Sequence, residues 1–87
     1  MYIVIAGAGL VGRGLAQRLV KARHDVVVVD SNKAVCEWVA AHVGSLAQHG
    51  SATNIAVLRQ AGLERADVAV STMRADADNL AFALLAK

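Results

Sequence analysis

The sequence of 87 residues contains little cysteine and few aromatic side chains. Its one cysteine, Cys36, cannot form an internal disulfide, and no second thiol completes a CxxC pair. Because Tyr2, Trp38 and Phe82 are the only aromatic residues, the interior must be built from small and branched side chains. With 56% hydrophobic and 18% charged residues, the composition excludes a disordered chain. These features favour one small domain in which helices cover a parallel sheet.

Concentrated positive charge is absent as well. The formal net charge is +2 and no two Lys or Arg residues are adjacent, which argues against nucleic-acid or anionic-membrane binding. The longest stretch without formal charge, residues 38–58, holds too many polar side chains to predict a transmembrane helix. The apolar run at the N-terminus has no basic residues ahead of it, unlike a signal peptide. We therefore expect a cytoplasmic protein that is not inserted directly in a membrane.

Strand and helix patterns alternate along the chain. Residues 2–6 and 26–29 are continuous apolar runs, typical of strands buried on both faces. Residues 45–49 and 68–71 predict two further strands, the first of them weak. Apolar residues at helical spacing predict helices that begin near Val11, after Asn32, after Thr53, and after Asp76 or Asp78. Ser31 or Asn32 is expected to cap the second helix and Thr53 the third, and Ala61-Gly62 is typical of a left-handed helix end.

This alternation predicts right-handed βαβ crossovers, and so a Rossmann-like α/β fold with helices on both faces of a parallel sheet. We expect residues 1–87 to form a single domain whose four strands lie in the order 3-2-1-4. The fourth strand would then be an unprotected edge. The chain is therefore expected to be an incomplete or associating form of a larger unit.

A glycine motif follows the first predicted strand. Gly7-Ala8-Gly9-Leu10-Val11-Gly12 has the pattern G-x-G-x-x-G, it opens a predicted helix, and Asp30 follows Gly12 by 18 residues at the end of the next strand. In this context the pattern is the dinucleotide-binding fingerprint. The alternative is a structural glycine turn, with Asp30 only capping the second helix.

Each member of the motif has a physical task. Gly7 permits the tight turn, Gly9 lets a pyrophosphate approach the backbone, and Gly12 lets the helix pack closely on the sheet. The phosphates then meet the free amides and positive dipole of the first helical turn. Asp30 can accept hydrogen bonds from the adenosine ribose hydroxyls, and its charge would repel a 2′-phosphate. The motif therefore favours NAD or a plain adenine nucleotide over NADP.

Catalytic residues are not recognisable in the sequence. His24, His42 and His49 lack metal-ligand spacing, and none of them, nor Tyr2, is placed to transfer a proton near a nicotinamide. Thr72 follows the fourth strand, where its hydroxyl either contacts the ligand or caps the local backbone. We therefore expect a protein that is not an enzyme and holds no metal.

The chain resembles the N-terminal nucleotide-binding domain of the regulator-of-K⁺-conductance family, also called KTN or Trk-type N domains. The resemblance covers nearly all of the chain, and it rests on residues 3–9, 11–12, 24–30, 50–53, 61–67, Thr72 and 79–80. It implies a cytosolic regulatory subunit or gating ring of a potassium transporter or channel. Such domains bind NAD(H) or ATP/ADP, and they dimerise or form rings.

Residue by residue, the resemblance makes the three glycines the phosphate loop and Asp30 the acid that binds the ribose. It places Ser51 beside the adenine, with Thr72 and Asn79 near the far half of the ligand. The family commonly has Arg where this chain has Leu10, and Arg13 in the next turn is a substitute. Ser51 likewise replaces a frequent Asp.

Three hypotheses follow. The first is a nucleotide-binding regulatory domain of a potassium uptake or channel system, with NAD(H) as first candidate ligand and ATP, ADP or AMP as alternatives. A homodimer or ring and a membrane transporter or channel subunit are the expected partners. The second is the cofactor-binding part of an NAD-dependent oxidoreductase, and the third is an assembly domain that binds no ligand. We predict cofactor contacts from Gly7, Ala8, Gly9, Leu10, Val11, Gly12, Asp30, Ser31, Ser51, Ala52 and Thr72.

Overall fold

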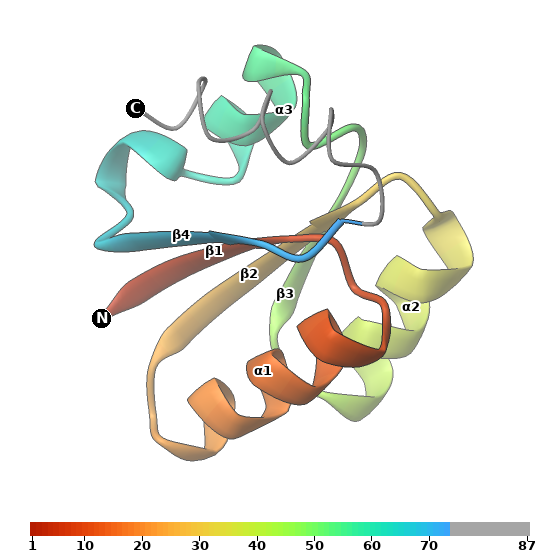
Figure 1. Cartoon of the computed structure of the whole chain (residues 1–87), viewed down its shortest axis with the longest axis vertical. Helices are drawn as coiled ribbons and strands as arrows, with labels where there is room; N and C mark the ends of the chain where they lie inside the picture. The colour runs from red at the N-terminus through yellow and green to blue at the C-terminus, as the bar shows by residue number, and fades with distance from the viewer. Residues whose placement is uncertain (74–87) are drawn as a thin grey trace.

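The fold is a four-stranded parallel sheet covered by helices, as Figure 1 shows. The computed structural model describes residues 1–73. The strands are β1 (Tyr2–Ala6), β2 (Asp25–Asp30), β3 (Leu46–His49) and β4 (Val68–Ser71). The helices are α1 (Leu10–Lys21), α2 (Lys33–His42), α3 (Ile55–Gln60) and the short 3-10 helix η1 (Leu63–Arg65). The strand order β3-β2-β1-β4 confirms the predicted Rossmann-like topology.

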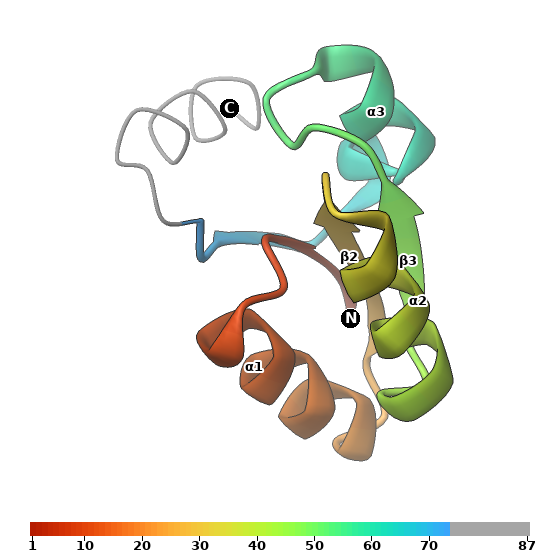
Figure 2. The same ribbon diagram turned by 90° about the vertical axis from the view of Figure 1, so that its right-hand side faces the viewer.

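Two layers of side chains cover the two faces of the sheet. Because successive strand residues point to opposite faces, Ile5 and Val28 meet α1 and α2, whereas their neighbours in the strands meet α3. Figures 1 and 2 show α1 and α2 on one side of the sheet and α3 on the other. This arrangement confirms the predicted helices on both faces of the sheet. The chain crosses from one face of the sheet to the other between α2 and α3.

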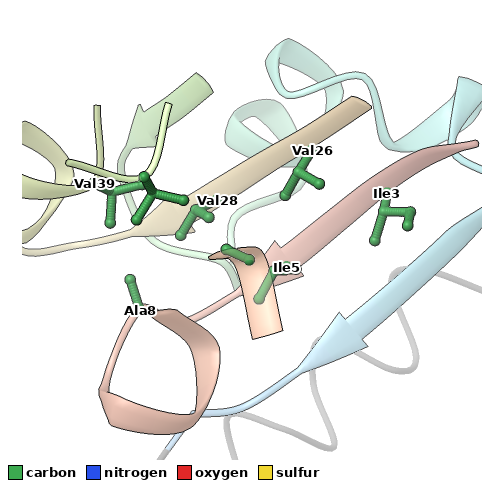
Figure 3. Close-up of a cluster of buried hydrophobic side chains, with 8 residues drawn as sticks. Ile3, Ile5, Ala8, Val26, Val28 and Val39 are labelled. Carbon is green, nitrogen blue, oxygen red and sulfur yellow. The ribbon is translucent and has the colours of Figure 1, made fainter. Parts of the chain in front are cut away.

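The core is built from branched and small side chains, as the composition predicts. Figure 3 shows Ile3, Ile5, Val26 and Val28 from the two central strands beside Val39 of α2. Ile5, Val28 and Val39 are fully buried. Each such side chain stabilises the fold by about 1.5–3 kcal/mol relative to leaving it in water. The two central strands are therefore buried on both faces.

Helix boundaries follow local polar side chains. Asn32 caps α2, since its side chain accepts from the amides of Ala34 and Val35. The prediction of Thr53 as the cap of α3 is wrong, because the next residue, Asn54, accepts from the Ala56 amide at 2.9 Å. The expected left-handed residue after α3 is confirmed at Gly62, where φ is 86°.

Both edges of the described sheet are short strands of four residues. The third strand was expected from Ser45, and it begins one residue later at Leu46. In the described part of the chain β4 pairs with β1 alone. The predicted fourth helix lies outside the described residues. No helix within residues 1–73 is long and apolar enough to cross a membrane.

Candidate functional site

Two glycines bring the loop after β1 against the end of β4. Gly7 has a positive φ of 97°, a backbone conformation that residues with a side chain rarely adopt. Its amide donates to the Val29 carbonyl oxygen at 2.8 Å. A Cβ on Gly12 would lie 2.2 Å from the Gly7 carbonyl oxygen and 2.7 Å from Thr72 Oγ1. No side chain fits at residue 12, so its glycine allows α1 to start directly under the loop.

Gly9 is the N-cap of α1 and provides no side-chain cap. The first hydrogen bond of the helix runs from the Arg13 amide to the Gly9 carbonyl at 2.9 Å. The amides of residues 9–12 therefore have no intrahelical acceptor. A Cβ on Gly9 would meet nothing within 4 Å, so the space beside these donors is open. Leu10 and Val11, which carry two of these amides, are 86% and 72% exposed.

The carboxylate of Asp30 faces this loop from the end of β2. One oxygen accepts from the Ala8 amide at 2.9 Å, and the other accepts from the Asn32 amide at 2.8 Å. A carboxylate oxygen has two lone pairs, so each oxygen can accept a further hydrogen bond. Asp30 therefore joins the glycine loop to the β2–α2 turn and keeps acceptor capacity beside it.

A cavity of about 570 Å³ connects these features. This volume lies in the range of about 300–1,000 Å³ that small-molecule sites occupy. Its described lining is Gly7, Ala8, Gly9, Arg13, Val29, Asp30, Ser31, Asn32, Val35, Ser51, Ala52, Thr53, Thr72 and Met73. Eight of the eleven predicted contact residues are thus brought together. The lining does not include Leu10, Val11 or Gly12.

Two hydroxyl groups of the predicted site, those of Thr72 and Ser51, are bonded within the protein. Thr72 Oγ1 lies 3.0 Å from the Gly7 carbonyl oxygen, to which it donates, and 3.3 Å from the Ala6 carbonyl oxygen. Ser51 Oγ lies 2.8 Å from Thr53 Oγ1. Thr72 therefore supports the glycine loop from β4, and Ser51 orders the turn before α3. Asn79, which was expected with Thr72 near the far half of the ligand, lies outside the described residues.

Sequence reasoning did not name several lining residues. The sequence pattern does not single out Val35, and it predicts Thr53 only as a helix cap, yet both line the cavity. Asn32 was considered only as a cap, although its place two residues after Asp30 puts it at the same edge of the sheet. Its position two residues after Asp30 in the sequence could have predicted a place in the site. Residues that follow a strand of a parallel sheet lie at the edge where ligands bind.

Charge in the site comes from Asp30 and Arg13, together with the partial positive charge at the start of α1. Nearby, the Cys36 thiol donates to the Asp30 carbonyl oxygen at 3.4 Å. Burial, followed by the negative charge of Asp30, raises the pKa of this thiol. In residues 1–73, no three His, Cys, Asp or Glu side chains form a group able to hold a metal ion.

Comparison with known proteins gives the family. The model of the TrkA-N domain matches residues 3–87. The chain belongs to the TrkA-N domain family. This confirms the resemblance that the glycine loop, the acid after β2 and the downstream motifs indicate.

Three relatives of this TrkA-N domain carry related names. A Trk system potassium uptake protein TrkA homolog of Archaeoglobus fulgidus is 44% identical over 87 residues, all of this chain and 20% of the relative. A protein of the same name from Methanothermobacter thermautotrophicus is 34% identical over the whole chain and 40% of its own length. The Trk system potassium uptake protein TrkA of Vibrio alginolyticus is 35% identical over 93% of this chain and 18% of its own length. The chain thus spans less than half of each relative.

Proposed function

We propose that residues 1–87 form a nucleotide-binding domain of a regulatory component in a potassium uptake system. NAD(H) is the first candidate ligand, and ATP, ADP and AMP are the alternatives. One observation carries this proposal: a single cavity joins the open helix start at Gly9 to the carboxylate of Asp30. Hydrogen-bond donors at one end and acceptors at the other match the phosphates and the ribose of a nucleotide.

The cavity and the helix start beside it suit the two halves of such a ligand. Phosphate oxygens would accept from the amide of Gly9, which lines the cavity, and from the adjoining amides of residues 10–12, none of which has an intrahelical acceptor. Ribose hydroxyls would donate to the remaining lone pairs of Asp30, which the Ala8 and Asn32 amides hold in place. A 2′-phosphate would be repelled by the same carboxylate. NADP should therefore bind more weakly than NAD.

The regulatory part of the proposal is supported by the relatives, whose names place them in the Trk potassium uptake system. We propose that the chain acts in the cytoplasm on a membrane potassium transporter, as a homodimer or ring. Nucleotide occupancy would then alter how the subunits pack. Hydrolysis is not needed, because a ligand that binds two arrangements with different affinity shifts their equilibrium.

Calorimetric titration of the purified chain with NADH, NAD, ATP and ADP tests the ligand. Asp30→Ala should weaken binding about tenfold or more, because a hydrogen bond to a charged group contributes about 1.5–3 kcal/mol. Asp25→Ala is the matched control, since Asp25 begins the same strand at its opposite end and is exposed. An unchanged dissociation constant in Asp30→Ala would refute the ribose assignment. Absence of binding by the unmodified chain would refute the nucleotide site.

The mass of the chain in solution, measured with and without the bound nucleotide, tests the regulatory part. A change of oligomeric state, or of cross-linking between subunits, is the expected result. If nucleotide binds with no such change, the ligand assignment stands and the proposed effect on subunit packing is wrong.

A further inference from the structure

Arg13 is the one basic residue in the described lining of the cavity. It lies one turn into α1, directly after Gly12, and its side chain is directed toward α2. There its guanidinium carbon lies 4.8 Å from the centroid of the Trp38 ring. An arginine at this distance from an indole face is held by a cation–π contact. Trp38 therefore fixes the direction of the Arg13 side chain.

The hydrogen-bonding capacity of Arg13 is not met by the described part of the protein. Its Nε atom is buried and has no hydrogen-bond partner. Among residues 1–73 the ion pair formed is Arg59 with Glu64, at 3.4 Å, and no carboxylate pairs with Arg13. A buried donor without a partner is costly, above all on a charged group. A phosphate in the cavity would offer the guanidinium an acceptor that the described side chains do not provide.

We propose that the Arg13 guanidinium contacts a phosphate group of the bound nucleotide, with Trp38 as the positioning residue. The inference rests on the proposed function. A guanidinium presents planar donors that match phosphate oxygens, and it stacks well on an aromatic ring. Arg13 follows the open amides of residues 9–12 on the same helix, so the cation and the amides can share one anion.

Two phosphates could supply this chemistry. One is the phosphate chain at the ribose 5′ position, which the amides at the start of α1 also favour. The other is a 2′-phosphate, because Arg13 shares the cavity with Asn32 and Val35 of the β2–α2 region. Asp30 opposes a 2′-phosphate, and we therefore assign the contact to the 5′ chain.

A ligand series tests the contact. Adenosine, AMP, ADP, NAD and NADP are titrated against the unmodified chain, Arg13→Gln, Arg13→Lys and the control Arg18→Gln. Arg18 lies on the same helix and is exposed. Arg13→Gln should weaken ADP binding about tenfold or more and leave adenosine binding nearly unchanged. Arg13→Lys keeps the charge without the planar donors, so its loss should be intermediate.

Fluorescence gives a second readout that a purely structural role would not produce. Trp38 is the only tryptophan of the chain, so its emission responds to changes around its ring, which contacts the Arg13 guanidinium and the His42 ring. ADP should change this emission in the unmodified chain and in Arg18→Gln, and it should do so much less in Arg13→Gln. Thermal unfolding of each variant checks that the fold is retained.

The outcomes are distinct. An equal loss for adenosine and ADP in Arg13→Gln would overturn the inference, as would no loss at all. A loss confined to NADP would overturn the assignment to the 5′ chain and would place the contact at the 2′-phosphate. If the unmodified chain binds no nucleotide, the proposed function fails, and the assignment of Arg13 fails with it.

Discussion

Replacement of Gly12 by alanine is the sharpest test of the loop geometry. The added Cβ would lie 2.2 Å from the Gly7 carbonyl oxygen and 2.7 Å from Thr72 Oγ1. The nearer atom belongs to the backbone of a loop that is itself held by hydrogen bonds to Val29 and Thr72. The clash therefore cannot be relieved by rotating a side chain. Overpacking of this kind costs about 1–3 kcal/mol or more.

Gly14→Ala is the matched control on the same helix. A Cβ on Gly14 would meet nothing within 4 Å, so this variant should gain about 0.5–1 kcal/mol from the better helix propensity of alanine. For a domain of this size each kcal/mol shifts Tm by about 4–8 °C. We expect Gly14→Ala to raise Tm by about 2–8 °C. With a net cost of about 1–2 kcal/mol, Gly12→Ala should lower it by about 4–16 °C.

Circular dichroism during thermal and urea unfolding measures both variants. Two-state behaviour of each is checked first, because the comparison of free energies depends on it. If Gly12→Ala unfolds at or above the Tm of the unmodified chain, α1 does not start directly under the loop. The description of the site would then be wrong.

Three further predictions concern single residues. Gly9→Ala should lower the free energy of unfolding by no more than about 1 kcal/mol, because its Cβ meets nothing within 4 Å and alanine is only a poorer N-cap than glycine. It should nevertheless weaken nucleotide binding about tenfold in calorimetry by filling the space beside the open amides. Asn32→Ala should lower the free energy of unfolding by about 1 kcal/mol in urea titrations, since it removes the cap of α2. Burial raises the pKa of the Cys36 thiol above its ordinary value of 9.0, so iodoacetamide should modify the native chain more slowly than the unfolded one. By linkage, the free energy of unfolding should fall as the pH rises above about 9, and Cys36→Ala should lessen this fall.

The sheet could be predicted from the sequence because its central strands have one simple pattern. Residues 2–6 and 26–29 are continuous apolar runs, which only burial on both faces explains. Short links between strands and helices then leave little freedom in topology. The ends of the elements were less predictable. Thr53 and Asn54 are both good capping residues, and the choice between them depends on backbone angles that adjacent residues do not encode.

Those residues of the candidate site were predictable whose residue type is required for one particular contact. Gly12 and Asp30 belong to a spaced motif, and the structure places both at the loop after β1. Val35 and Thr53 were not foreseen, since a valine on a helix and a threonine in a turn have many other uses. The pairing of Arg13 with Trp38 joins residues 25 positions apart in the sequence. This contact depends on how α1 and α2 pack on the sheet. No local sequence pattern predicts the relative placement of two helices.

The support that Thr72 gives to Gly7 also affects the order in which the domain can be completed. The loop lies near the N-terminus, but the hydrogen bonds from Thr72 to residues 6 and 7 span about 65 positions of the chain. Closing so long a loop carries an entropy cost that local helix formation does not. During synthesis, α1 and α2 can therefore form early, whereas the support of the glycine loop by Thr72 must wait until β4 has left the ribosome. A nascent chain shorter than this would carry the glycine motif without a formed site.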